Sequence, residues 1–167
     1  MNRYARTPIT VLLTMAMVSC YFPGYKLKPS DKIRNMELTT SFDKNLYELC
    51  DLPHLRSGKC EIPASVSTIG VSSGWAENTI EELDSTWSNS RWQMTMDDMQ
   101  VDLSAFGTFD STFGLQKARM WKVGIANITP GKHTVHYRFY FENGDNKGNH
   151  EETFIFTVVA AEQPKKP

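Results

Sequence analysis

The chain has 167 residues, of which 40% are hydrophobic and 11% aromatic, and its formal net charge is −1. These values are typical of one folded domain and argue against intrinsic disorder, because the apolar side chains can offset the entropy lost on folding. A charge this close to zero also argues against a strongly basic surface for nucleic acid. We therefore expect a single folded domain and no nucleic-acid partner.

The first 19 residues have the pattern of an export signal. Arg3 and Arg6 precede an apolar run over 9–18, and no acidic residue occurs before Asp31. The run is shorter than the roughly 20 apolar residues that a transmembrane helix needs. A buried N-terminal helix is the alternative, but the basic residues before the run favour a signal peptide over 1–19.

The end of this signal, Met17-Val18-Ser19-Cys20, resembles the lipobox of bacterial lipoproteins, in which a cysteine follows small or aliphatic residues. The resemblance implies that Cys20 becomes the mature N-terminus and carries acyl chains. Several chains together anchor a protein stably to a membrane. Cleavage by an ordinary signal peptidase, with Cys20 merely nearby, is the alternative.

The two remaining cysteines are expected to form a disulfide. Once Cys20 is set aside, Cys50 and Cys60 form an even pair, and an exported protein folds in an oxidising compartment. His54 lies between them and could instead complete a Cys/His metal site. Export favours the disulfide.

The composition changes at both ends of the chain. Residues 20–31 contain two prolines, a glycine and no apolar period, and are expected to form a tether. Residues 162–167 form a polar, proline- and lysine-rich tail that is expected to be disordered. The folded domain is therefore predicted over 32–161.

Within this domain, apolar and polar residues alternate with the period of two that predicts β-strands. The clearest example is 132–141, where Val135, Tyr137 and Phe139 share one face. The turn-forming segment 142–149 and the apolar run 153–159 follow, and together they predict a terminal hairpin. Further strands are predicted over 36–42, 66–71, 91–96 and 120–125, with a turn at Asp97 and Asp98.

One short helix is predicted, with Asn78 and Glu81 as a capping box and Leu83 inside it. Short strands separated by turns, without long βαβ units, predict an all-β fold: an immunoglobulin-like antiparallel β-sandwich with one short helix. The residues expected in its core are Trp92, Trp121, Tyr137, Phe139 and Phe156.

A resemblance to known proteins extends over about 74–159. The turn Pro130-Gly-Lys-His-Thr134, the alternating strand after it and the final strand 153–159 resemble the closing strands of bacterial immunoglobulin-like domains. Upstream, Gly74-Trp75, Trp92-x-Met-x-Met-Asp97, Val101-Asp-Leu103 and Arg119-x-Trp121 are similar to motifs of uncharacterised bacterial surface lipoproteins. The resemblance implies a structural module and carries no known activity.

Catalytic and metal-binding patterns are weak. Gly70-Val71-Ser72-Ser73-Gly74 matches a nucleophile elbow, but no long helix pattern follows, so a loop between strands is the better interpretation. His133 and His136 are three residues apart on a strand and therefore point to opposite faces. The loop acids Asp97, Asp98, Asp102 and Asp145 follow no EF-hand spacing. We expect no enzymatic activity, cofactor or metal.

A possible ligand contact lies between 96 and 120, expected as a loop, where Phe106, Phe109 and Phe113 stand among small polar residues. This composition suits a sugar-stacking surface or an apolar peptide groove, unless the rings pack under the loop against the core. We therefore expect a non-enzymatic, lipid-anchored domain of the bacterial envelope, facing outside or periplasm, with an envelope protein or glycan as partner. A carbohydrate- or peptide-binding module using the aromatic loop is the alternative.

Overall fold

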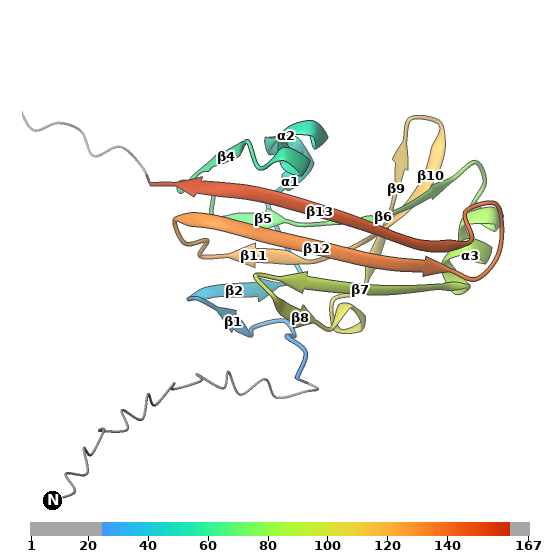
Figure 1. Ribbon diagram of the computed structural model, residues 1–167, viewed down its shortest axis with the longest axis horizontal. Helices are drawn as coiled ribbons and strands as arrows, with labels where there is room; N and C mark the ends of the chain where they lie inside the picture. The colour runs from blue at the N-terminus through green and yellow to red at the C-terminus, as the bar shows by residue number, and fades with distance from the viewer. Residues whose placement is uncertain (1–24, 161–167) are drawn as a thin grey trace, which may run out of the picture.

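The computed structural model describes residues 25–160, and strands are their main secondary structure (Figure 1). The predicted signal peptide, Cys20 and the tail over 162–167 lie outside the described residues. No helix within 25–160 is long and apolar enough to cross a membrane.

The largest sheet has five strands in the order β4-β13-β12-β7-β8. Its strands are β4 (Cys60–Pro63), β13 (Gly148–Val159), β12 (Gly131–Phe141), β7 (Ser90–Met96) and β8 (Met99–Val101). The predicted terminal hairpin is confirmed, because β12 and β13 pair in antiparallel register along their length. The alternation seen in the sequence places one face of this sheet in the core.

A second five-stranded sheet has the order β1-β2-β11-β5-β3. Its strands are β1 (Lys32–Ile33), β2 (Met36–Thr39), β11 (Gly124–Ala126), β5 (Thr68–Gly70) and β3 (Lys44–Asn45). Buried side chains of both five-stranded sheets form one hydrophobic cluster. The predicted β-sandwich is therefore confirmed.

The third sheet consists of β6 (Gly74–Glu77), β10 (Gln116–Trp121) and β9 (Thr108–Phe113), in the order β6-β10-β9. The hairpin β9–β10 projects beyond the sandwich (Figure 1). The expectation of a loop between 96 and 120 is therefore wrong. This segment forms β8, a 3₁₀ turn over Leu103–Ala105, β9 and most of β10.

Within residues 25–160, three α-helices replace the single expected one: α1 (Leu46–Leu49), α2 (Leu52–Ser57) and α3 (Ile80–Ser88). The predicted helix is α3, but its capping box is formed by Thr79 and Glu82, one residue later than expected. The helices α1 and α2 are too short for an apolar period to appear in the sequence.

The sheets are not purely antiparallel, as had been expected from the sequence. Strand β4 pairs with β13 in parallel, and β3 pairs with β5 in parallel. Leu27, placed in the expected tether, is buried and forms a parallel bridge with Val101, so packed chain begins before the expected boundary at residue 32. Pairing between strands that are far apart in the sequence leaves no local pattern, so the sequence did not predict these parallel pairs.

The predicted core residues lie on the inward faces of their strands. Tyr137 and Phe156 are fully buried, and the Tyr137 hydroxyl donates a hydrogen bond to the carbonyl oxygen of Val71. Trp92, Trp121 and Phe139 are half-buried and pack against the core cluster. The rings of Trp92 and Phe139 stack with their centroids 4.4 Å apart.

The turn at Asp97 and Asp98 is confirmed as the connection between β7 and β8, where Met96 pairs with Met99. Both residues have positive φ angles, of 45° and 67°. A two-residue hairpin turn of type I′ requires this conformation, and aspartate tolerates it better than most residues.

Candidate binding surface

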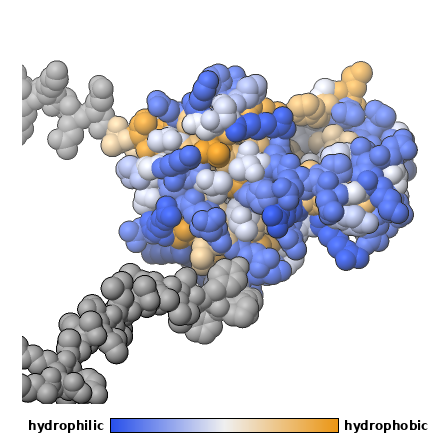
Figure 2. Space-filling view, in the orientation of Figure 1, coloured by the Kyte–Doolittle hydropathy of each residue, from blue (hydrophilic) through white to orange (hydrophobic). Residues whose placement is uncertain are grey.

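A groove of about 730 Å³ separates the hairpin β9–β10 from α1 and α2. Figure 2 shows it as a hollow between the helices and the apolar tip of the hairpin. We call it the hairpin groove. Its lining includes aromatic and aliphatic side chains from segments far apart in the sequence: Phe42, Tyr47, Leu52, Phe109, Phe113 and Met120.

Small side chains keep the groove hollow. Gly74, Ala76, Ala118 and Ser111 line it from three neighbouring strands. A Cβ atom at Gly74 would lie 2.0 Å from the carbonyl oxygen of Arg119, so only glycine allows β6 to approach β10 this closely. The volume that larger side chains would fill is therefore open to a ligand.

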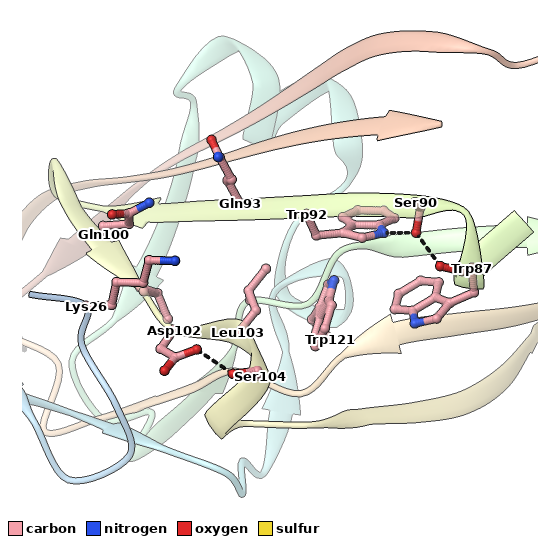
Figure 3. Close-up of a pocket in the computed structure, with 11 residues that line it drawn as sticks. Lys26, Trp87, Ser90, Trp92, Gln93, Gln100, Asp102, Leu103, Ser104 and Trp121 are labelled. Atoms are coloured by element: carbon pink, nitrogen blue, oxygen red, sulfur yellow. Dashed lines mark hydrogen bonds between the residues drawn. The ribbon is translucent and has the colours of Figure 1, made fainter. Parts of the chain in front are cut away.

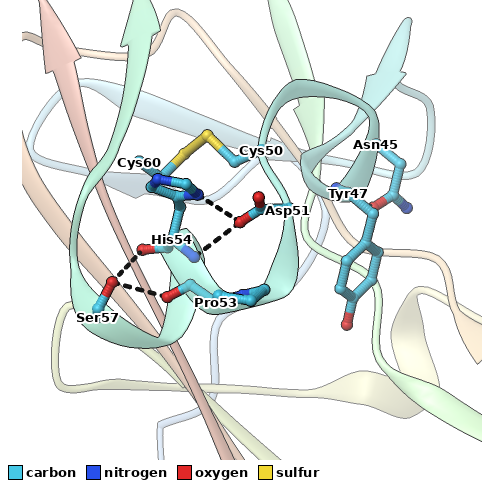
Figure 4. Close-up of a disulfide and its surroundings, with 8 residues drawn as sticks. All are labelled: Asn45, Tyr47, Cys50, Asp51, Pro53, His54, Ser57 and Cys60. Atoms are coloured by element: carbon cyan, nitrogen blue, oxygen red, sulfur yellow. Dashed lines mark hydrogen bonds and ion pairs between the residues drawn. A yellow bond between two sulfur atoms is a disulfide. The ribbon is translucent and has the colours of Figure 1, made fainter.

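The opposite wall consists of α1 and α2. The Tyr47 ring packs edge-to-face on Phe154 with centroids 5.4 Å apart, and Leu55 buries the inner face of α2. The Cys50–Cys60 disulfide, predicted from the sequence, is present and ties the end of α1 to the start of β4 (Figure 4). The disulfide thus anchors this wall to the sandwich.

The electrostatic character of the groove is acidic. Its lining includes Glu48, Asp51 and Glu152 but no Lys or Arg side chain. Arg56, outside the lining, forms an ion pair with Glu152 at 3.0 Å. Hydrogen bonds from the backbone and ring of His54 hold the pKa of Asp51 below its usual range. Asp51 therefore stays ionised, and neither it nor Glu48, which accepts the backbone N–H of Asn45, forms an ion pair with a Lys or Arg of the described chain.

The three phenylalanines proposed as ligand contacts do not form one exposed surface. Phe106 is only 5% exposed and belongs to the core. Phe109 is half-buried and packs edge-to-face on Phe42 with ring centroids 6.4 Å apart, and both rings line the groove. Phe113 is 72% exposed and Leu115, which the sequence analysis missed, is 98% exposed. The hairpin thus carries an apolar tip beside the groove.

An arginine fixes the hairpin to α3 on the face away from the groove. Arg119 of β10 donates two hydrogen bonds to Asp110 of β9, at 2.6 and 2.9 Å, and one to Asp84 of α3 at 2.8 Å. These bonds raise the pKa of the guanidinium, which is ionised in any case. The hairpin β9–β10, which carries the exposed tip, is therefore held in place by a hydrogen bond to α3.

A second recess, of about 340 Å³, lies beside three tryptophans (Figure 3). We call it the tryptophan recess. The rings of Trp87 and Trp92 stack 5.1 Å apart, and Trp121 lies 5.4 Å from Trp87. The Trp121 indole N–H is buried without a hydrogen-bond partner. Polar side chains complete the lining: Lys26, Ser90, Gln93, Gln100, Asp102 and Ser104. The sequence contained these tryptophans but gave no sign that they meet.

The catalytic and metal patterns do not form sites. Ser72 is buried in the connection between β5 and β6, without the strand-turn-helix geometry of a nucleophile elbow. His133 contacts Asp97, whereas His136 bonds to Thr153 on the other face. Within 25–160, no three His, Cys, Asp or Glu side chains have an arrangement that could hold a metal ion.

No family model matches the chain, and no curated protein matches it. Among solved structures, one that is similar is the crystal structure of the cysteine protease inhibitor EhICP2 from Entamoeba histolytica. The two chains share 11% identity over 60% of this chain and 83% of the other, with a TM-score of 0.30. A TM-score this low does not establish a shared fold.

Proposed function

We propose that this protein is an exported, lipid-anchored, non-enzymatic binding domain of the bacterial envelope, and that the hairpin groove is its recognition surface. The observation that carries the proposal is an open groove with aromatic walls beside a braced hairpin whose tip exposes Phe113 and Leu115. Large exposed apolar side chains next to a concave surface are typical of a binding site.

The sandwich is proposed to be of the immunoglobulin-like type. The order β13-β12-β7-β8 is that of the G, F, C and C′ strands in such domains, and β5 and β11 are neighbours, as strands B and E are. Immunoglobulin-like domains commonly present binding surfaces on structures that connect their strands. The hairpin β9–β10 is such a connection, between β8 and β11.

Export and anchoring predict that Cys20 is acylated. In a bacterial host, wild-type protein is expected to incorporate labelled palmitate and to fractionate with membranes, whereas Cys20→Ala is expected to incorporate none. Autoradiography of the purified protein measures the label. Cys50 and Cys60 serve as internal controls, because their disulfide leaves no free thiol. An unlabelled wild-type protein would contradict the lipoprotein assignment.

A carbohydrate-binding module is the second candidate, and the tryptophan recess favours it. Aromatic rings beside amide, carboxylate and ammonium groups are the combination that binds the apolar faces and hydroxyls of sugars. The rings of Trp87 and Trp92 stack on each other, which leaves less ring face for a cation to contact. Lys26 also lines the recess and would repel a cation, so a neutral sugar is the more suitable ligand.

One experiment with two arms separates these candidates. A phage-displayed peptide library selected on wild-type protein is expected to yield peptides that no longer bind Phe113→Ser but still bind Ile80→Ser, a control at an exposed apolar residue outside the groove. A glycan array forms the second arm. Glycan binding that survives Phe113→Ser but is lost in Gln93→Ala would assign the function to the tryptophan recess instead.

A further inference from the structure

We propose that the hairpin groove binds a small organic cation built on a flat aromatic ring system, that is, an aromatic amine. This inference rests on the proposed function, because it names the ligand class of that groove. The groove volume of about 730 Å³ lies within the range of roughly 300 to 1,000 Å³ that is typical of small-molecule sites.

The floor of the groove is a row of small side chains that crosses the third sheet. Ser111 of β9, Ala118 of β10 and Ala76 of β6 are directly opposite one another in the strand register. Residues paired in this way are neighbours on the same face of a sheet, and all three line the groove. Ala118, in the middle of the row, is only 6% exposed. The row is therefore the bottom of the groove, which lies over this face of the sheet.

Large side chains bound this row at both ends along the strands. On one side are Phe109 and Met120, which pair with each other in the register, and on the other side is Phe113. Phe109 and Phe113 are four residues apart, which corresponds to roughly 13 Å along a strand. This interval suits a ligand of one or two fused rings.

The aromatic lining favours a ring over an alkyl chain. Tyr47 and Phe42 line the groove together with the phenylalanines of β9. Aromatic pairs gain energy beyond the burial of their area when they are offset or edge-to-face, which an alkyl chain cannot reproduce. The negative face of such rings also attracts a nearby cation. A flat, positively charged ring therefore matches this lining better than a flexible chain does.

The charged side chains of the groove select the sign of the ligand charge. Glu48, Asp51 and Glu152 line the groove, and no Lys or Arg of residues 25–160 does. Glu152 pairs with Arg56, which stands outside the lining, whereas Glu48 and Asp51 form no ion pair with a Lys or Arg of the described chain. Charge of one sign attracts a ligand of the opposite sign and repels one of the same sign. The groove is therefore expected to prefer a cation to a neutral or anionic molecule of the same shape.

A second copy of this chain is a poorer occupant. Its exposed tip residues, Phe113 and Leu115, would bring apolar side chains to the groove but no charge. The nearest basic residue, Lys117, directly precedes Ala118 on β10, and successive residues of a strand point to opposite faces. Lys117 therefore points away from the groove-facing side of the hairpin.

The test uses four probes, titrated into the full chain by isothermal titration calorimetry: naphthylmethylamine, naphthylmethanol, naphthoic acid and octylamine. The first three share one flat ring system and differ in charge, whereas octylamine places the charge on a flexible chain. We expect the aromatic amine to bind about fivefold more tightly than the alcohol, since exposed carboxylates contribute modestly. The acid and octylamine are expected to bind at least about tenfold more weakly than the aromatic amine.

The charge variants are chosen to keep the helix caps. Asn is as good an N-cap as Asp, and Gln replaces Glu in a capping box, so Glu48→Gln with Asp51→Asn removes two charges and leaves α1 and α2 capped. This double variant is expected to lower the preference for the amine over the alcohol to less than about twofold and to bind the alcohol as before. The matched control, Glu61→Gln with Glu81→Gln, removes two exposed carboxylates outside the groove and is expected to keep the full preference.

A floor variant tests the place of binding. Ser111 is exposed on the outer strand β9, so Ser111→Leu adds a side chain to the floor of the groove without touching the core. It is expected to weaken the binding of the amine and the alcohol alike by at least about tenfold. The matched control is Ser65→Leu, the same change at an exposed serine outside the groove, and it is expected to bind both probes normally.

Each contrary result overturns a defined part. Equal binding of the amine and the alcohol to the wild type would exclude the cationic class, and equal binding of octylamine would exclude the flat ring. Binding that survives Ser111→Leu would place the ligand outside the groove. Failure of all four probes, while the library selection still yields groove-dependent peptides, would overturn this inference and leave the proposed function standing. A concentration-dependent dimer that is lost in Ser111→Leu would make a second copy the occupant.

Discussion

Replacing Phe156 with alanine is expected to lower the free energy of unfolding by about 3 to 5 kcal/mol. Phe156 is fully buried on β13, where it is paired with His133 of β12 on one side and Cys60 of β4 on the other. The cost combines the lost transfer energy of the ring with the cavity left in the core. It is a large fraction of the 5 to 15 kcal/mol that is typical of folded domains. Urea unfolding followed by tryptophan fluorescence measures it.

The matched control is Phe113→Ala, which removes the same atoms from the exposed tip of the hairpin. Phe113 is 72% exposed, so its removal is expected to change the free energy of unfolding by no more than about 0.5 kcal/mol. Equal effects of the two substitutions would show that the inner face of β13 has been misassigned.

Replacing Asp97 with asparagine is expected to destabilise the protein by about 3 kcal/mol. One carboxylate oxygen of Asp97 accepts the backbone N–H of Thr134 and the other contacts Nδ1 of His133, both at 2.9 Å. The side chains of Asp97 and His133 are 4% and 2% exposed. Nε2 of His133 donates to the carbonyl oxygen of Thr129 at 2.8 Å, so Nδ1 donates to Asp97 when both ring nitrogens carry hydrogen. An asparagine whose oxygen keeps the bond from the Thr134 N–H would then turn its NH₂ group towards the Nδ1–H group.

Asp98→Asn is the control for this substitution. Asp98 is the other residue of the same turn, is exposed, and has a similar positive φ angle, which asparagine also tolerates. Its substitution is expected to change the free energy of unfolding by less than about 0.5 kcal/mol. Thermal unfolding of the two variants side by side tests the difference. Similar losses would mean that the turn conformation, and not the buried contact of Asp97 with His133, determines stability here.

The buried Asp97 also shows how a sequence pattern can have a different meaning in the folded protein. In the sequence, Asp97 is one of several loop acids without EF-hand spacing, and its neighbour Asp98 is exposed. The structure brings Asp97 to His133 and places Arg34 3.8 Å away. Arg34 lies between β1 and β2, Asp97 between β7 and β8, and His133 near the start of β12, so these residues meet only in the folded protein.

The features that the sequence itself determined are those with a local physical cause. The alternation over β12 and β13 requires one apolar face, so it fixed a terminal hairpin and the burial of Tyr137 and Phe156. The aspartates at 97 and 98 allowed the left-handed turn between β7 and β8. Two cysteines remain once Cys20 is set aside, and this even number predicted the disulfide that the structure shows between Cys50 and Cys60.

The candidate site was decided by the tertiary structure. Phe106, Phe109 and Phe113 are close in sequence, yet they are buried, half-buried and exposed in turn, because a 3₁₀ turn carries Phe106 into the core before β9 leaves the sandwich. The hairpin β9–β10 is solvated along much of its surface, so it lacks the clean alternation that reveals a half-buried strand.

The other wall of the groove left still less trace in the sequence. The helices α1 and α2 have four and six residues, too few for a helical period to emerge, and they are held by Asn45 and Asp51 caps, a disulfide and the burial of Leu55. Residues near 47 and near 113 face each other only after the sandwich has formed. Local chemistry thus determined the strands and turns of this protein, and long-range packing decided where a ligand could bind.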